Sequence, residues 1–181
     1  MEIPRRANAV RNRARILDVT RALIAERGAG VGMDEIAGAA GLAVGTLYRH
    51  FPDKRSLVAA ALEDTLVRVA GEIDAAAHRV RSGGDARDEL NALLVDGDEA
   101  DRRLHALKEA AALLGHDSHG STAMPAMTRA IEGLLGSGVA QGQIRADISA
   151  ADIYLLLATA PRDDGPRRRW AHLILASILR G

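Results

Sequence analysis

The side chains best suited to chemistry stand close together in this 181-residue sequence, between positions 46 and 50. The hydroxyls of Thr46 and Tyr48 can donate hydrogen bonds to phosphate oxygens. The guanidinium of Arg49 can reach a phosphate or the edge of a guanine, and the imidazole of His50 can donate to a phosphate. Donors of these types in one short run are typical of a surface that contacts nucleic acid.

Small residues accompany these donors. Ala43 and Gly45 would let the start of a helix approach DNA closely, whereas Val44 cannot hydrogen-bond to a base and can at most touch a thymine methyl group. Sequence specificity would then rest on Arg49 and on DNA shape. Lys54 follows at the start of the next expected helix, where its cation can meet the phosphate backbone. The candidate DNA-binding residues are Ala43, Val44, Gly45, Thr46, Tyr48, Arg49, His50 and Lys54.

A helix-turn-helix within residues 34–57 would position these side chains. Ala37 is small enough to let the second helix cross the first closely, and Gly41 tolerates the positive φ that the turn requires. Ile36, Leu42 and Leu47 are spaced to serve as apolar anchors. The opposite face of the second helix would then be free to enter the major groove.

Some residues of the second helix have a structural alternative. Leu47 and Phe51 are expected in the core. Tyr48 can also pack there with only its hydroxyl reaching out, and His50 can be an ordinary surface histidine.

The run GLAVGTLYRHFPDKRSLV resembles the DNA-binding signature of TetR-family repressors, and the resemblance extends through ARILDVTRALIAERGAGVGMDEIA, over about residues 13–62. It implies a dimer that binds an operator and leaves it when a small molecule enters the C-terminal domain. By position it places recognition contacts at Ala43, Val44, Thr46, Tyr48, Arg49 and His50, and a backbone contact at Lys54. Met33-Asp34 departs from the family's frequent threonine or basic residue there, so we expect Asp34 to stabilise the helix start instead.

Composition favours an all-α fold. Hydrophobic residues make up 48% of the chain but only four residues are aromatic, so the core must be built from Ala, Leu, Ile and Val. No segment alternates as a strand would. The absence of cysteine excludes disulfides and thiolate chemistry. No apolar run is long enough for a membrane span and no secretory signal is evident, so we expect a cytoplasmic protein.

The chain is expected to divide into two domains. Residues 1–60 hold ten Arg and Lys against six Asp and Glu, whereas the remainder is acidic. We therefore predict a basic helix-turn-helix domain over residues 1–60, with Met1 to Asn12 as a mobile basic arm or a solubilising tail. A long helix from Asp53 to about Arg81 would join it to a helical effector-binding and dimerisation domain over residues 61–181. Local signals mark helix ends: Asp53 and Ser149 are expected to cap helix starts, and Gly28, Gly136 and Gly138 to end helices.

The second domain reads as five helices with two candidate surfaces. By analogy with the family, the last two helices form the dimer interface, and the alternative is that these residues belong to the monomer core. The candidates are Ile153, Leu156, Leu157, Trp170, Ile174 and Ile178. An effector pocket among the middle helices, again against plain core as the alternative, would be lined by Leu107, Ala111, Leu114, Met124, Met127 and Ile131.

Two polar clusters have less specific patterns. His116-Asp117-Ser118-His119, with His105, can be a metal site, but solvated loop residues of this kind are commoner and no metal is expected. Arg167-Arg168-Arg169 is expected to be a solvated helix start, with a second DNA contact as the alternative.

Three classes of function compete. The first is a ligand-responsive regulator, expected to be a repressor, that binds a palindromic operator as a homodimer. The alternative is a DNA-binding regulator or architectural DNA binder without a small-molecule effector. An enzyme is not expected, because the sequence contains no cysteine, no glycine-rich phosphate loop and no nucleophile-elbow serine. No cofactor is expected either.

Overall fold

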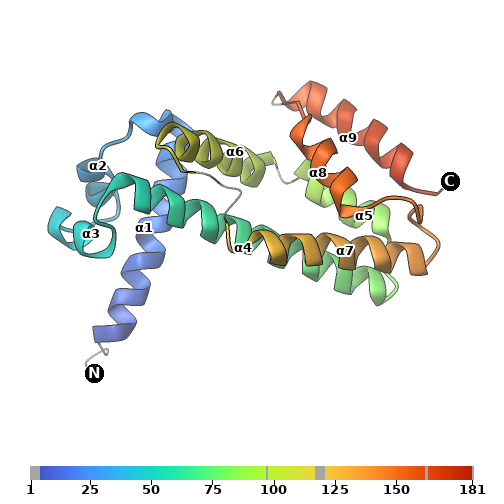
Figure 1. Cartoon of the computed structure of the whole chain (residues 1–181), viewed down its shortest axis with the longest axis horizontal. Coiled ribbons are helices and arrows are strands. Elements are labelled where there is room, and N and C mark those ends of the chain that lie inside the picture. The colour runs from blue at the N-terminus through green and yellow to red at the C-terminus, as the bar shows by residue number, and fades with distance from the viewer. Residues whose placement is uncertain (1–4, 97, 117–120, 162, 181) are drawn as a thin grey trace. The chain divides into compact units, whose positions relative to one another are not determined.

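The computed structural model describes residues 5–96, 98–116, 121–161 and 163–180, which form the predicted all-α fold (Figure 1). Within these ranges the β-structure is limited to one isolated bridge between Ile144 and Leu179. The helical segments are α1 (Arg5–Arg27), η1 (Gly28–Gly30), α2 (Met33–Ala39), α3 (Val44–His50), α4 (Lys54–Arg81), α5 (Ala86–Asn91), η2 (Ala92–Asp96), α6 (Asp98–Leu113), α7 (Met124–Ala140), α8 (Ala150–Ala158) and α9 (Asp164–Ile178).

The chain groups into two compact units. We name Met1–Thr65 with Arg102–Ser121 the head unit, and Leu66–Asp101 with Thr122–Gly181 the body unit. Helix α4 runs continuously from one unit into the other, over the length that the sequence predicts. This grouping does not test whether residues 1–60 fold independently, so the predicted domain boundary stays a prediction.

Helix α1 begins earlier than expected. The sequence predicts a mobile arm as far as Asn12, but the chain is helical from Arg5. Alanines at positions 7, 9 and 14 and the intervening arginines are strong helix formers, so the expectation of a mobile arm is wrong for residues 5–12. The helix ends before Gly28, whose φ of +71° matches its predicted role as a terminator.

The head unit has a closed apolar core. Its fully buried side chains include Ile16, Ile24, Ile36, Leu47 and Leu57. Each of these residues comes from a different helix, except that Ile16 and Ile24 share α1. The core therefore joins α1, α2, α3 and the start of α4, and it fixes α3 in place by its buried face.

One charged side chain is buried in this core. Arg21 of α1 is almost fully buried, and its Nη1 donates to the carboxylate of Asp64 in α4 at 2.6 Å. Its Nη2 donates to Asp18 on the same helix. A buried guanidinium needs such partners, because leaving it unpaired in a low-dielectric interior would cost several kcal/mol.

In the body unit, α7 is longer than predicted. The sequence suggests an end at Gly136 and Gly138, but the helix continues to Ala140, so that expectation is wrong. The physical reason at Gly138 is close packing, because a Cβ there would lie 2.4 Å from Cδ1 of Ile144. Ile144 is fully buried and bridges Leu179, which ties the segment after α7 to the end of α9.

Helix α8 begins with a complete capping box. The Ser149 hydroxyl accepts from the backbone N–H of Asp152, and the Asp152 carboxylate accepts from the N–H of Ser149 at 2.9 Å. This confirms the predicted capping role of Ser149, since both orphan amides gain a partner.

Across the described residues, no helix combines the length and the apolar content that crossing a bilayer requires.

Candidate nucleic-acid interface

The turn between α2 and α3 has the geometry of a helix-turn-helix. Gly41 has a φ of +63°, as the sequence predicts. The N–H of Leu42 donates to the carbonyl of Ala37 at 2.9 Å, which closes the end of α2. Ala37 is fully buried, so its methyl group leaves room for the close crossing of α3. Helix α2 and the turn therefore support the short helix α3.

Helix α3 has one buried and one exposed face. Leu47 is fully buried and Phe51 is nearly so, as predicted. On the opposite side Tyr48 is 45% exposed and Val44 is 37% exposed, so Tyr48 is a surface residue rather than part of the core. Of the remaining candidates on this segment, Ala43, Gly45 and Arg49 are exposed, and Thr46 and His50 are half-buried.

The guanidinium of Arg49 lies back along α3. Its Nε donates to the carbonyl of Gly45 at 3.1 Å, and its Nη2 donates to the Thr46 hydroxyl at 3.3 Å. Both bonds are exposed to solvent, so water competes with them. Arg49 can therefore exchange them for a phosphate or a base edge.

Lys54 has a structural contact that the sequence does not indicate. Its Nζ donates to the backbone carbonyl of Ala29 in η1, and the residue is half-buried. The lysine thus ties the start of α4 to η1, the short turn that follows α1. A phosphate contact by Lys54 stays a prediction, and it would have to share the ammonium with this bond.

The start of α4 is stabilised by Asp53, as predicted. The backbone N–H of Ser56 donates to Oδ1 of Asp53 at 2.7 Å. This hydrogen bond, together with that from the Ser56 side chain, lowers the pKa of Asp53 below the usual aspartate value. The charged cap formed by Asp53 fixes where α4 begins, shortly after the end of α3.

Two arginines of α1 lie against the helix-turn-helix, and the sequence analysis did not single them out. Arg13 has its Cζ 4.7 Å from the centroid of the Phe51 ring, just after α3. Arg15 lies at the turn before α3, where a Cβ on Gly41 would be 3.0 Å from its Nη2. The signal available in the sequence was the density of arginine between residues 5 and 15 without an acidic residue.

The predicted effector residues fall into both units. Leu107 and Ala111 are buried and Leu114 is half-buried in the head unit, whereas Met127 and Ile131 are buried and Met124 is half-buried in the body unit. Their role stays a prediction.

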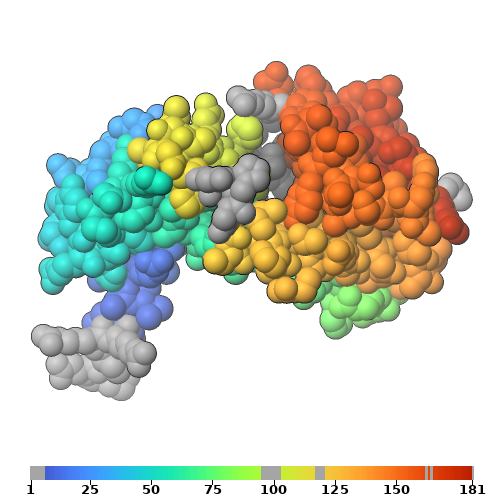
Figure 2. Space-filling model, viewed as in Figure 1, coloured from blue at the N-terminus to red at the C-terminus, as the bar shows by residue number. Residues whose placement is uncertain are grey.

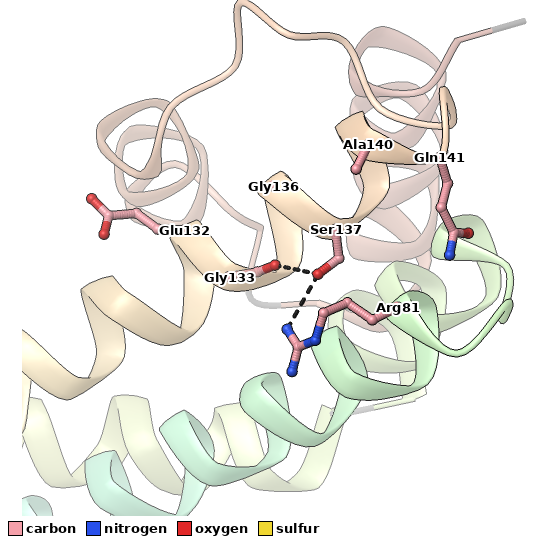
Figure 3. A pocket seen from close by; sticks show the side chains of 7 residues that line it. All are labelled: Arg81, Glu132, Gly133, Gly136, Ser137, Ala140 and Gln141. Carbon is pink, nitrogen blue, oxygen red and sulfur yellow. Dashed lines mark hydrogen bonds between the residues drawn. The ribbon is translucent and has the colours of Figure 1, made fainter.

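The body unit has a pocket elsewhere, with a volume of about 390 Å³ between the end of α4 and α7 (Figure 3). Nη1 of Arg81 donates to the Ser137 hydroxyl at 3.3 Å, and this hydroxyl donates to the carbonyl of Gly133 at 2.6 Å. The residues that line this pocket are Arg81, Glu132, Gly133, Gly136, Ser137, Ala140 and Gln141.

The predicted dimer residues differ in exposure. Ile178 is buried in the core of its own chain, Leu157 is exposed, and Ile153, Leu156, Trp170 and Ile174 are half-buried. Two further leucines, which the sequence analysis did not select, are more exposed: Leu155 on α8 at 68% and Leu173 on α9 at 53%. Side chains of α8 and α9, coloured orange to red, form part of the surface in Figure 2. The dimer assignment stays a prediction.

The histidine cluster lies mostly outside the described residues, since residues 117–120 are not described. Among all the residues that the structure describes, no group of three or more histidine, aspartate or glutamate side chains is arranged to hold a metal ion.

Comparison with known proteins places the head unit in a family. Residues 16–61 match the sequence pattern of bacterial regulatory proteins of the tetR family. The transcriptional repressor KstR of Mycolicibacterium smegmatis is 38% identical over 99 residues, which are 54% of this chain and 47% of that protein. The repressor KstR2 of Rhodococcus jostii is 33% identical over 147 residues, covering 75% of this chain and 69% of that protein.

Solved structures agree over nearly the full length. A TetR transcription regulatory protein from Mycobacterium vanbaalenii superposes with a TM-score of 0.78 at 32% identity, covering 98% of this chain and 100% of that one. The regulator SCO0520 of Streptomyces coelicolor superposes with a TM-score of 0.70 at 24% identity, covering 92% and 98%. The chain spans about half the length of KstR but all of the Mycobacterium structure.

The helix-turn-helix geometry, the sequence match over the same residues and the full-length structural agreement converge. The chain belongs to the TetR family of DNA-binding transcriptional regulators, and not to a class of enzymes.

Proposed function

We propose that the chain is a ligand-responsive repressor that binds a palindromic operator as a homodimer and is released by a small molecule. The observation that carries the DNA-binding part is the split of α3 into a buried anchor and an exposed face of donors. Only side chains free of the core can exchange their contacts for base edges and phosphates. The relatives KstR and KstR2 bear the name of repressors, which supports repression here.

The exposed leucines of α8 and α9 support a homodimer. Leu155 and Leu173 leave large apolar side chains in water, and burying each would stabilise an interface by about 1.5–3 kcal/mol. A two-fold dimer presents two copies of α3, so its operator would be palindromic, with half-sites spaced by about a helical turn of DNA.

A hydrogen bond between the start of α4 and the turn after α6 supports release by an effector. Nη2 of Arg55, in the second position of α4, donates to the carbonyl of Gly115 just after α6 at 2.8 Å. Helix α6 also buries Leu107 and Ala111 within the head unit. A ligand that displaced α6 would therefore strain contacts of the unit that carries α3.

The first test is selection of bound sites from random duplex DNA by the purified protein, with sedimentation equilibrium of the protein and of its complex. We expect an enriched palindrome occupied by two chains. A protein that enriches no sequence, or binds its site as a single chain, would overturn the proposal.

The effector is tested separately, by adding a library of small apolar metabolites to the preformed complex with the selected site and following release by fluorescence anisotropy. Release by one compound class at saturating concentration supports the ligand-responsive function. Retention of DNA with every compound, including any that bind by native mass spectrometry, favours a regulator without an effector.

A further inference from the structure

Residues 7–15 of α1 contribute no buried side chain to the core. Burial along this helix begins at Ile16, and Arg11, Arg13 and Arg15 before it are exposed. Between Arg5 and Leu17 the sequence has five arginines and no acidic residue. Figure 1 shows this part of α1, in blue, extending beyond the rest of the head unit. A helical segment that buries little and carries only positive charge is suited to a polyanionic partner.

Two of these arginines are held at opposite ends of α3. Arg13 stacks on Phe51, which directly follows the last residue of α3. Arg15 lies against Gly41, two residues before the N-cap of α3 at Ala43. The recognition helix is thus bracketed by two guanidinium groups that belong to another helix.

Both guanidinium groups keep donors for a ligand. Stacking on Phe51 uses the flat face of Arg13, whereas its N–H groups lie in the plane of the guanidinium. Among the described residues, no carboxylate pairs with Arg13 or Arg15, in contrast to Arg21 and Arg27, which form ion pairs. Planar guanidinium groups bind phosphate oxygens through two parallel hydrogen bonds.

We propose that Arg13 and Arg15 bind the DNA phosphates that flank the groove entered by α3, which makes α1 a second DNA-binding element of the head. The inference rests on the proposed function, because it assumes that α3 meets DNA. Charge complementarity and continuity with α3 select DNA as the partner. The two contacts fix register on the duplex and carry no base specificity.

The experiment compares the double variant R13Q/R15Q with the parent chain on the selected operator and on a random duplex, between 50 and 200 mM salt. Each lost phosphate contact lowers the slope of log K against log salt by about 0.9, and a dimer loses two contacts in each chain, so we expect a decrease of about 3.6 on both duplexes. Over this fourfold range of salt the ratio of parent to variant affinity should fall by about a hundredfold. An unchanged slope would overturn the proposal.

Matched variants separate a DNA contact from a structural role. R87Q/R129Q removes the same charge from exposed positions of the body unit and should leave the slope unchanged. R13K/R15K keeps the cations but loses the planar stacking on Phe51. It should restore at least half of the lost slope. A slope that stays lowered in R13K/R15K, together with a fall in thermal stability in both double variants, would show that the arginines only support the fold.

Arg49→Ala distinguishes the inference from the proposed function. If Arg49→Ala abolishes the preference for the operator while R13Q/R15Q leaves the slope unchanged, only the role of α1 is refuted. If neither variant changes binding, the DNA-binding surface itself is wrongly assigned.

Discussion

The helix-turn-helix of the head unit and the α8–α9 pair of the body unit differ in how they place their large aliphatic side chains. In the helix-turn-helix, Ile36 and Leu47 are fully buried, and the exposed side of α3 carries the hydrogen-bond donors of Tyr48 and Arg49. In the body, α8 and α9 leave Leu155 and Leu173 more than half exposed. The helix-turn-helix therefore keeps its leucine and isoleucine anchors in its own core and offers polar contacts, whereas α8 and α9 leave apolar surface that a further surface can cover.

This difference indicates what each unit needs from a partner. Exposed hydrogen-bond donors and cations favour DNA binding, because contacts to phosphates give affinity and contacts to base edges give specificity. A protein–protein interface is stabilised by buried apolar area, and its buried centre is more apolar than its rim. Variants that remove one property at a time from one unit test this division.

The largest expected effect comes from charging the apolar surface of the body. Leu155→Asp with Leu173→Asp should produce a monomer by sedimentation equilibrium, because two carboxylates would be buried without partners at the interface. Affinity for a palindromic operator should fall at least a hundredfold, since two linked heads bind more tightly than one by about 10²–10⁴.

The matched control is Leu113→Asp, at a 73% exposed leucine in the head unit. It should leave the association state unchanged. A dimer that persists in the double variant would contradict the assignment of α8 and α9.

Removing the main donor of α3 should have the next largest effect. Arg49→Ala should weaken operator binding by about 1–3 kcal/mol for each half-site and relax the preference at one base position in each, because a bidentate base contact is worth about that much. Binding is measured by anisotropy and folding by circular dichroism. Unchanged operator affinity in a folded variant would refute the base contact.

A stability change confined to the body is expected from Gly138→Ala. The new Cβ would lie 2.4 Å from Ile144 Cδ1, so Ile144 or α7 must shift. Overpacking of this kind costs about 1–3 kcal/mol. Chemical denaturation measures this loss, and Gly136→Ala is the control because open space surrounds a Cβ there. Equal stability of the two variants would show that the Gly138 contact relaxes freely.

The smallest expected effect concerns the charged cap of α4. Hydrogen bonds from Ser56 lower the pKa of Asp53, so this carboxylate stabilises the fold above the usual aspartate range and loses that contribution as the pH falls through its lowered pKa. Asp53→Asn keeps an acceptor but removes the charge. It should be slightly less stable at neutral pH, and the difference should shrink in acid.

Chemical denaturation at neutral and acid pH measures this difference. Asp74→Asn, at an exposed carboxylate in the middle of α4, is the control because Asp74 does not cap a helix. A stability difference for Asp53→Asn that grows in acid would contradict the assigned sign.

Local sequence signals predicted most of the elements. The signals are local in each case. Gly28 and Gly41 adopt a positive φ, and Asp53 and Ser149 accept hydrogen bonds from residues three positions later. The apolar residues of α4 repeat at helical spacing. The wrong predictions concern positions where packing contacts, rather than the local sequence pattern, determine the structure. Gly138 reads as a helix end, but it sits inside α7 because Ile144 packs where its side chain would be. The sequence of the first turns of α1 suggests a mobile arm, because no apolar stripe accompanies its arginines.

The sequence by itself determined the all-α class and the buried anchors Leu47 and Phe51, because helix periodicity and turn glycines are encoded over a few residues. The resemblance over residues 13–62 indicated the family. Only the tertiary structure decided that Arg13 and Arg15 flank α3, that Lys54 binds the Ala29 carbonyl, and that Ile178 is core while Leu155 and Leu173 are surface. These outcomes depend on which helix faces pack together, and helical spacing alone identifies an apolar stripe without identifying what covers it.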